Sequence, residues 1–167
     1  MDKIPEDLKH IRFAALDMLR DYNYFLPPIN VVNICKGEGI DVNEFDFPLS
    51  IDELAGYFDF KSRIIYLNKS DDNSNKIFVI SYILGNYLLN KESMEKFPEK
   101  YSIAMKKMGS LEGDDLIARQ AICFARNLLV PKFILDAYRD LLDINDLSKI
   151  FGVTPLLIQK RIEQEYE

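Results

Sequence analysis

The chain has 167 residues, of which 48% are hydrophobic and 29% charged, a composition typical of a globular protein. Its net charge of -6 and its pI of about 4.9 argue against a general electrostatic attraction to nucleic acid or anionic membranes. A chain of this length can bury a substantial core, and we expect one domain over residues 1–167.

Two features favour a cytoplasmic protein without a membrane span, and the cysteines are interpreted in that setting. The N-terminal segment MDKIPEDLKH carries charges and a proline where a signal peptide needs an apolar core. The longest nearly apolar run, residues 77–89, is shorter than the roughly 20 residues that cross a bilayer. Cys35 and Cys123 lie far apart in apolar settings, so we expect two buried thiols rather than a disulfide.

The N-terminal third predicts two helices and a strand. Apolar residues at helical spacing indicate a helix over residues 4–22, and Pro5 suits its first turn. A second helix is expected after the two prolines at 27–28, and it ends near Gly37. Residues 40–45 then form a predicted strand.

A hairpin and a long helix follow. Residues 55–60 and 63–67 are rich in aromatic and β-branched side chains, and the short break at 61–62 predicts a hairpin between them. The polar run 71–75 forms a turn that can also cap the next helix, which we expect over residues 76–90.

The second half of the chain is predicted to be helical. The polar stretch 91–113 reads as a solvated connection that has room for a short helix at 101–108. Apolar periodicity then predicts four helices, over residues 114–130, 132–142, 145–151 and 154–165. Helices, a small antiparallel sheet and further helices indicate a mainly helical α+β fold rather than a parallel βαβ sheet.

Three segments together resemble the ImmA/IrrE family of zinc metallopeptidases. FVISYILGNYLLN (78–90) is similar to the family's Phe-Thr-Leu-Ala-His-Glu-Leu-Gly-His-Tyr-Leu-Leu-His helix. QAICFARNLLVP (120–131) is similar to Glu-Ala-Asn-x-Phe-Ala-x-x-Leu-Leu-Met-Pro, and LSKIFGVTPLLIQKRI (147–162) to the family's closing segment. The resemblance covers residues 28–162 and implies a zincin-like fold.

The sequence departs from the family at the positions that carry chemistry. In the family's His-Glu-x-x-His motif, two His bind zinc and the Glu is the general base. Tyr82 and Asn86 stand in place of the two His, Ile83 in place of the Glu, and Gln120 in place of a third ligand. An Ile cannot abstract a proton, and a neutral amide is a poor zinc ligand. The resemblance therefore implies a degenerate, catalytically inactive pseudopeptidase without zinc or another cofactor.

The spacing of the replaced residues still predicts a shared surface. Tyr82 and Asn86 are four residues apart and project from one helix face, which in the family looks into the cleft, with the position of Gln120 opposite. With Ile83 they mark a degenerate cleft. Its polar members either hydrogen-bond one another as structural filler or line a peptide groove that is retained without cleavage.

The resemblance also implies a biological context. Active family members act on helix-turn-helix repressors, often in mobile elements, prophages or stress responses. We therefore predict a regulatory protein that binds a repressor-like protein without cutting it, and neither nucleic acid nor a membrane is expected as its partner. The identity of the partner and the oligomeric state are left open.

The sequence leaves two other functions open. Residues 147–162 loosely resemble a helix-turn-helix, and such a DNA-binding protein would expose Gln159, Lys160 and Arg161 to a groove. An enzyme that uses other residues is the third reading. The sequence contains no glycine-rich phosphate loop, no Cys–His pairing and no nucleophile elbow that would support it.

Overall fold

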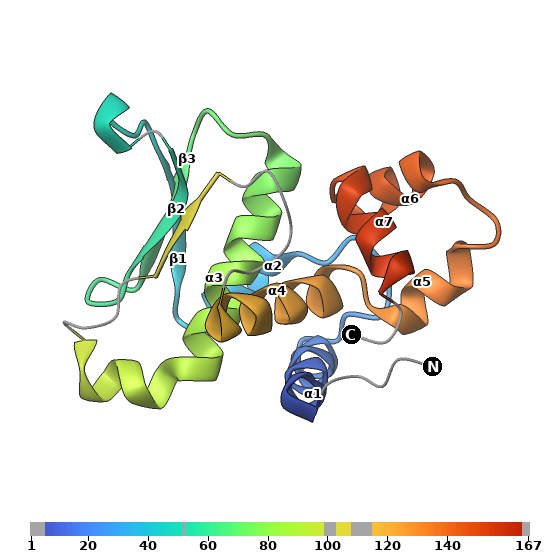
Figure 1. The fold of residues 1–167 in the computed structure, drawn as a ribbon, viewed down its shortest axis with the longest axis horizontal. Coiled ribbons are helices and arrows are strands. Elements are labelled where there is room, and N and C mark those ends of the chain that lie inside the picture. Colours follow the sequence, from blue (N-terminus) through green and yellow to red (C-terminus); the bar gives the residue numbers. More distant parts are fainter. Residues whose placement is uncertain (1–5, 52, 99–102, 108–114, 165–167) are drawn as a thin grey trace.

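A computed structural model describes residues 6–51, 53–98, 103–107 and 115–164 (Figure 1). The helices in these ranges are α1 (Glu6–Asp21), α2 (Val31–Gly37), α3 (Asn73–Lys96), α4 (Leu116–Leu129), α5 (Lys132–Tyr138), α6 (Ile144–Phe151) and α7 (Pro155–Glu163). The strands are β1 (Asp41–Phe45), β2 (Leu54–Asp59), β3 (Ile64–Asn68) and β4 (Ile103–Lys106), and a 3-10 turn, η1 (Leu49–Ile51), lies between β1 and β2. Within the described ranges, no helix is long and apolar enough to span a membrane.

The predicted helices are present because local sequence signals begin and end them. Asp72, Asp115 and Thr154 cap α3, α4 and α7, each accepting a hydrogen bond from a backbone N–H three residues on. Gly152 ends α6 at a φ of 67°, a left-handed conformation that glycine adopts without strain. The predicted residues 4–5, 99–102, 108–114 and 165 lie outside the described ranges.

The predicted solvated connection at 91–113 is wrong in two places. Helix α3 continues to Lys96, beyond the end predicted at residue 90. Residues 103–106 form strand β4 rather than a helix, and Ile103 and Met105 are buried. The strand forms because β2 offers a free edge and the core accepts these two alternating side chains, neither of which a local pattern reveals.

The four strands form one sheet in the order β1-β3-β2-β4. The predicted hairpin pairs β2 with β3 in antiparallel register, with Tyr57 opposite Tyr66, and β4 is antiparallel to β2. Strand β1 pairs with β3 in parallel, with Val42 opposite Ile65. The α+β class is therefore confirmed, but the sheet is mixed rather than purely antiparallel, because β1 pairs with the second strand of the hairpin.

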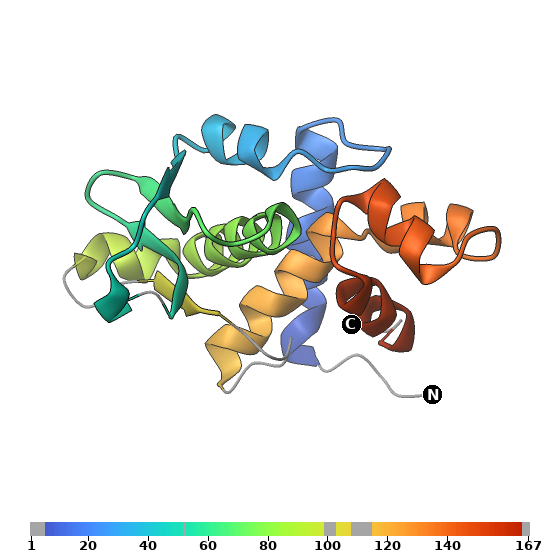
Figure 2. The ribbon, with the colours of Figure 1, turned by 90° about the horizontal axis from the view of Figure 1, so that it is seen from above.

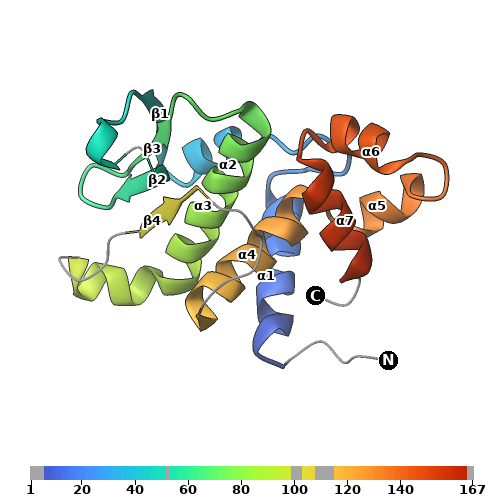
Figure 3. The same ribbon diagram turned by 45° about the horizontal axis from the view of Figure 1, so that its top comes forward.

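The elements stack in layers (Figures 1 and 2). Helix α3 covers one face of the sheet, where Phe58, Ile65 and Leu67 are buried beneath it. Helix α4 packs on α3 and also against α1, and its residues 121–129 are all buried. Figure 3 shows β4 at the sheet edge beside α3, with α5, α6 and α7 grouped at the opposite end of the molecule.

Candidate functional site

The candidate site lies where α3 crosses α4, and a glycine sets how closely the two helices approach. A Cβ on Gly85 would lie 2.5 Å from Cδ1 and 2.8 Å from Cγ of Phe124, both closer than real Cβ contacts. Phe124 is itself buried, so its ring has little room to move. The backbone of α3 therefore rests directly on the ring from α4, and the side chains around this crossing are held on fixed helices.

A line of polar side chains runs along α3 beside this crossing. Tyr82 lies one turn before Asn86, and the Asn86 side chain is near enough to influence the pKa of the Tyr82 hydroxyl. The Nδ2 of Asn90 donates to the Oδ1 of Asn86 at 3.2 Å and to its backbone oxygen at 2.9 Å. These three residues, each one turn from the next, form what we call the polar line. Asn90 was missed from the sequence, although the four-residue spacing of polar groups on an apolar helix could have revealed it.

The hydroxyl of Tyr82 is held in its neutral form. Burial is the main cause that raises the pKa of Tyr82, and the negative charge of Asp115 at the start of α4 raises it further. The hydrogen bond with Asn86 acts in the opposite direction. The phenol is therefore a neutral hydrogen-bonding group over the physiological pH range.

The other two predicted residues lie apart from the polar line. Ile83 has no exposed surface and lies towards β2, since a Cβ on Gly56 would be 3.4 Å from its Cδ1. Gln120 is half-buried on α4, one turn before Phe124 and so on the side of α4 that meets α3. Among the residues that the structure describes, no hydrogen bond joins Gln120 to Tyr82 or Asn86.

The amino-acid sequence matches a known protein family. The sequence profile of a peptidase family, described as the IrrE N-terminal-like domain, matches residues 35–163, a range that holds both helices of the crossing and most of the chain. The chain belongs to the IrrE N-terminal-like family. The resemblance noted in the sequence is thereby confirmed.

The IrrE-like fold is also found among solved structures. A Mycobacterium tuberculosis transcriptional regulator is similar with a TM-score of 0.64 at 17% sequence identity, an identity that supports likeness of fold alone. The match covers 93% of this chain and 47% of that chain, so this chain spans about half the length of that protein. No curated protein matches significantly.

The residues at the crossing of this IrrE-like chain do not fit the zinc ion that a metallopeptidase uses. A zinc site takes imidazole, thiolate or carboxylate ligands. The crossing instead offers a neutral phenol from Tyr82 and the amides of Asn86 and Gln120, and the single His of the chain, His10, is exposed on α1. In the described parts of the chain, no three His, Cys, Asp or Glu side chains come together to hold a metal ion.

Helix α7 packs against the C-terminal end of α4 through Arg161. Arg161 is 2% exposed, and its guanidinium donates to the backbone oxygen of Val130 and to Oδ1 of Asn127, both at 3.0 Å. Gln159 is exposed and donates to Glu163 on the same helix. The DNA-binding alternative required an exposed Arg161, and it does not meet that requirement, because the buried side chain holds α7 to the end of α4.

Proposed function

We propose that this chain is a catalytically inactive IrrE-like protein that regulates by binding, and that its partner is a helix-turn-helix repressor. The proposal rests on one combination of features. Helices α3 and α4 pack closely through Gly85 and Phe124, but the side chains beside this crossing are not of the types that bind zinc. The resemblance implies that active family members act on helix-turn-helix repressors, and the solved structure of similar fold is a transcriptional regulator; both support a partner in transcriptional control.

The polar groups around the crossing suit recognition rather than hydrolysis. Tyr82 remains neutral, and Asn86 and Gln120 each carry an amide that can donate and accept hydrogen bonds. A peptide backbone presents the same pairs of donors and acceptors. Without a general base or a zinc-bound water, such a groove would hold a peptide without attacking it.

We further propose that strand β4 takes part in the binding surface. It lies at the end of the strand order, next to β2, and packs beside α3. An edge strand can pair with an extended segment of another protein through its backbone groups. We propose that an extended segment of the repressor lies between β4 and the polar line.

A calorimetric titration with a repressor encoded next to this gene tests the proposal. We expect saturable binding that weakens on the order of tenfold when Asn86→Ala and Gln120→Ala are combined, since each removes one amide. Glu95→Ala, an exposed change near the far end of α3, is the matched control and should bind as the wild type does.

Mass spectrometry of the same mixtures tests inactivity directly. The repressor should stay intact after incubation with the protein in the presence of added zinc. Stoichiometric zinc together with cleavage of the repressor would overturn the inactive assignment. Absence of binding at the highest usable concentration would remove the repressor as the partner.

A further inference from the structure

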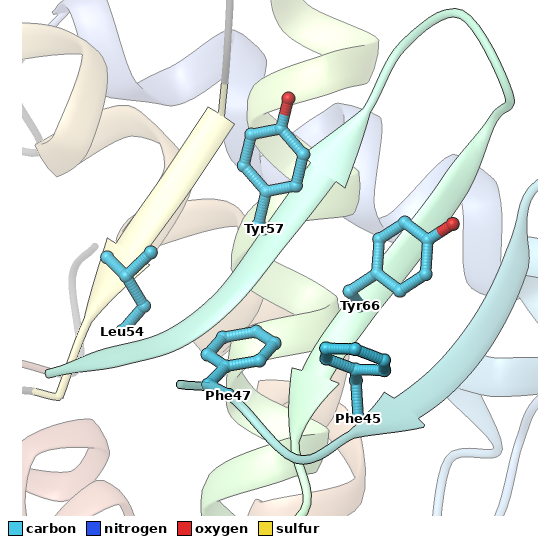
Figure 4. Close-up of a pocket in the computed structure, with 5 residues that line it drawn as sticks. All are labelled: Phe45, Phe47, Leu54, Tyr57 and Tyr66. Carbon is cyan, nitrogen blue, oxygen red and sulfur yellow. The ribbon is translucent and has the colours of Figure 1, made fainter. Parts of the chain in front are cut away.

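Strand β1 forms one edge of the sheet, at the opposite end of the strand order from β4. In Figure 4, β1 runs beside β3 and ends at Phe45, next to an apolar pocket on the sheet face that points away from α3. This pocket, here called the outer pocket, is lined by Phe45, Phe47, Leu54, Tyr57 and Tyr66. Among the residues that the structure describes, no strand lies beyond β1, so its outer edge is open to a further strand.

The hydrogen bonds between β1 and β3 show which backbone groups of β1 point outward. The N–H of Asp41 donates, and the C=O of Phe45 accepts, a hydrogen bond of 3.0 Å with a backbone group next to β3. Successive residues of a strand direct these groups to opposite edges, so the odd-numbered residues of β1 bond to β3. Val42 and Glu44 therefore direct their N–H and C=O groups away from the sheet.

Strand β1 lacks the features that usually keep an edge strand from pairing, such as a proline, a lysine or a bulge. Its five residues, DVNEF, pair with β3 without interruption. The Glu44 carboxylate lies 3.1 Å from Nζ of Lys76, whose side chain is only 10% exposed. This ion pair compensates the charge of Glu44, and the other charged residue of β1, Asp41, lies at the first position of the strand. The edge is therefore regular and carries little uncompensated charge.

We propose that the outer edge of β1 pairs with β1 of a second copy of this chain, in antiparallel orientation about a two-fold axis at Asn43. Two-fold dimers are the commonest homo-oligomers, and each copy then contributes the same surface. In this register, Val42 of each copy lies opposite the partner's Glu44, and each such pair exchanges two N–H···O bonds. The outward backbone groups of Val42 and Glu44 are thereby all satisfied.

Overlap and charge favour this register over the other two-fold arrangements. An axis at Asn43 pairs all five residues of β1, whereas an axis at Val42 or Glu44 leaves one end of the strand unpaired. An axis at Glu44 also places two carboxylates directly opposite each other, which is unfavourable. With the axis at Asn43, Asp41 lies opposite the partner's Phe45, so no like charges are directly opposite. The strand is thus complementary to itself, which favours a second copy as its partner.

This inference does not rest on the proposed binding of a repressor. Strands β1 and β4 lie at opposite edges of the sheet, so a dimer through β1 and a peptide beside β4 use different strands. The two proposals can therefore fail independently.

Sedimentation of the full chain at rising concentration tests whether the dimer forms. We expect a reversible dimer, since an interface built on one edge strand is small and small interfaces are typical of transient association. Val42→Pro should abolish the dimer, because proline removes an outward N–H that the pairing with β3 does not use. Val42→Thr keeps this N–H and is the matched control, which should dimerise as the wild type does. Thermal unfolding checks that both variants are folded.

A cysteine at the axis tests the register. The two copies of residue 43 would form a non-hydrogen-bonded pair with Cα atoms about 4.5 Å apart, a separation that a disulfide spans. Asp41 lies on the same exposed side of β1, but it would be about 14 Å from its counterpart in the partner. Under mild oxidation, Asn43→Cys should therefore cross-link on the order of tenfold faster than Asp41→Cys. Cys35 and Cys123 do not compete, since they are 0% and 1% exposed.

Three outcomes would overturn the inference. The first is a wild type that stays monomeric at the highest usable concentration, together with no cross-link in Asn43→Cys. The second is a dimer that persists in folded Val42→Pro and is lost in Phe47→Ser, which would place the interface on the outer pocket. The third is equally fast cross-linking of Asn43→Cys and Asp41→Cys, which would exclude the register centred on residue 43.

Discussion

Replacing Gly85 by Ala is the sharpest test of the α3–α4 crossing. The new methyl group would meet three atoms of Phe124 at 2.5, 2.8 and 3.0 Å, and Phe124 is 1% exposed. Overpacking of this kind costs about 1–3 kcal/mol, and the close approach here indicates the upper part of that range. Ala gains about 1 kcal/mol over Gly in a helix interior, so we expect a net destabilisation of about 1–2 kcal/mol.

The assay is reversible unfolding by denaturant and by heat. For a chain of this length, a loss of about 1–2 kcal/mol corresponds to a fall of roughly 2–8 °C in Tm. Ser93→Ala, at an exposed position of the same helix, is the control for helix propensity alone and should be neutral or slightly stabilising.

A double-mutant cycle identifies the cause. Phe124→Ala removes the Cγ and Cδ1 atoms that the methyl group meets, so in this background Gly85→Ala should stabilise the protein by about 1 kcal/mol. The effect of the same substitution therefore changes sign, with a coupling free energy of about 2–3 kcal/mol. A neutral or stabilising Gly85→Ala in the wild-type background would refute the close crossing.

Three further predictions concern other parts of the chain. Burial raises the pKa of the Cys35 thiol to about 12, so the thiol ionises in the unfolded state before it does so in the folded state as the pH rises. The wild type should therefore lose about 1.4 kcal/mol of its free energy of unfolding between pH 8 and pH 10, and Cys35→Ala should not show this loss. Arg63 has a φ of 59°, which is strained for any residue but glycine, so Arg63→Gly should be about 1 kcal/mol more stable than Arg63→Ala in denaturant unfolding. The combination of Tyr82→His, Asn86→His and Gln120→Glu should bind one zinc per chain by elemental analysis, since it restores three ligands on two fixed helices.

Each of these predictions has a result that contradicts it. Parallel pH profiles for wild type and Cys35→Ala would show that the thiol titrates alike in both states. A less stable Arg63→Gly would mean that backbone strain is small beside the added freedom of the unfolded chain. Equal zinc binding by the triple variant and by a variant that keeps Gln120 would show that α4 does not face the metal position.

The helices and the hairpin could be predicted because their signals are local. A capping Asp or Thr precedes an apolar run at helical spacing in α3, α4 and α7. A few adjacent residues therefore determine where each of these helices begins. The hairpin is similar, since two β-branched runs flank the short break at 61–62. No distant partner is needed to recognise these elements.

The elements that were wrongly predicted depend on distant partners. Strand β4 is only four residues long and lies in a lysine-rich stretch, and it forms because β2 presents an edge to it. The parallel pairing of β1 with β3 joins Asp41 to Ile64, residues separated by the whole of β2. Pairings of this kind follow from tertiary packing, which a local pattern does not contain.

The candidate site was only partly predictable for the same reason. Four-residue spacing places Tyr82 and Asn86 on one helix face, and the influence of the Asn86 side chain on the pKa of Tyr82 agrees with that. The orientation of Ile83 towards Gly56 depends on the sheet, and the outer pocket depends on the pairing of Tyr57 with Tyr66, neither of which the sequence pattern alone reveals.

In the function that we propose, the polar line and the α3–α4 contact take over the stabilising role that a metal has in a zinc protein. In a zinc protein, converging ligands are stabilised by the ion, and part of the folding free energy comes from metal binding. Here the Nδ2 of Asn90 donates to Asn86, and we propose that this bond takes the place of an ion in satisfying the partly buried polar groups of the polar line. The close contact of Gly85 with Phe124 then holds α3 and α4 together through packing. Because stability comes from these contacts, the surfaces beside the crossing remain ordered for binding, which is the use that we propose for them.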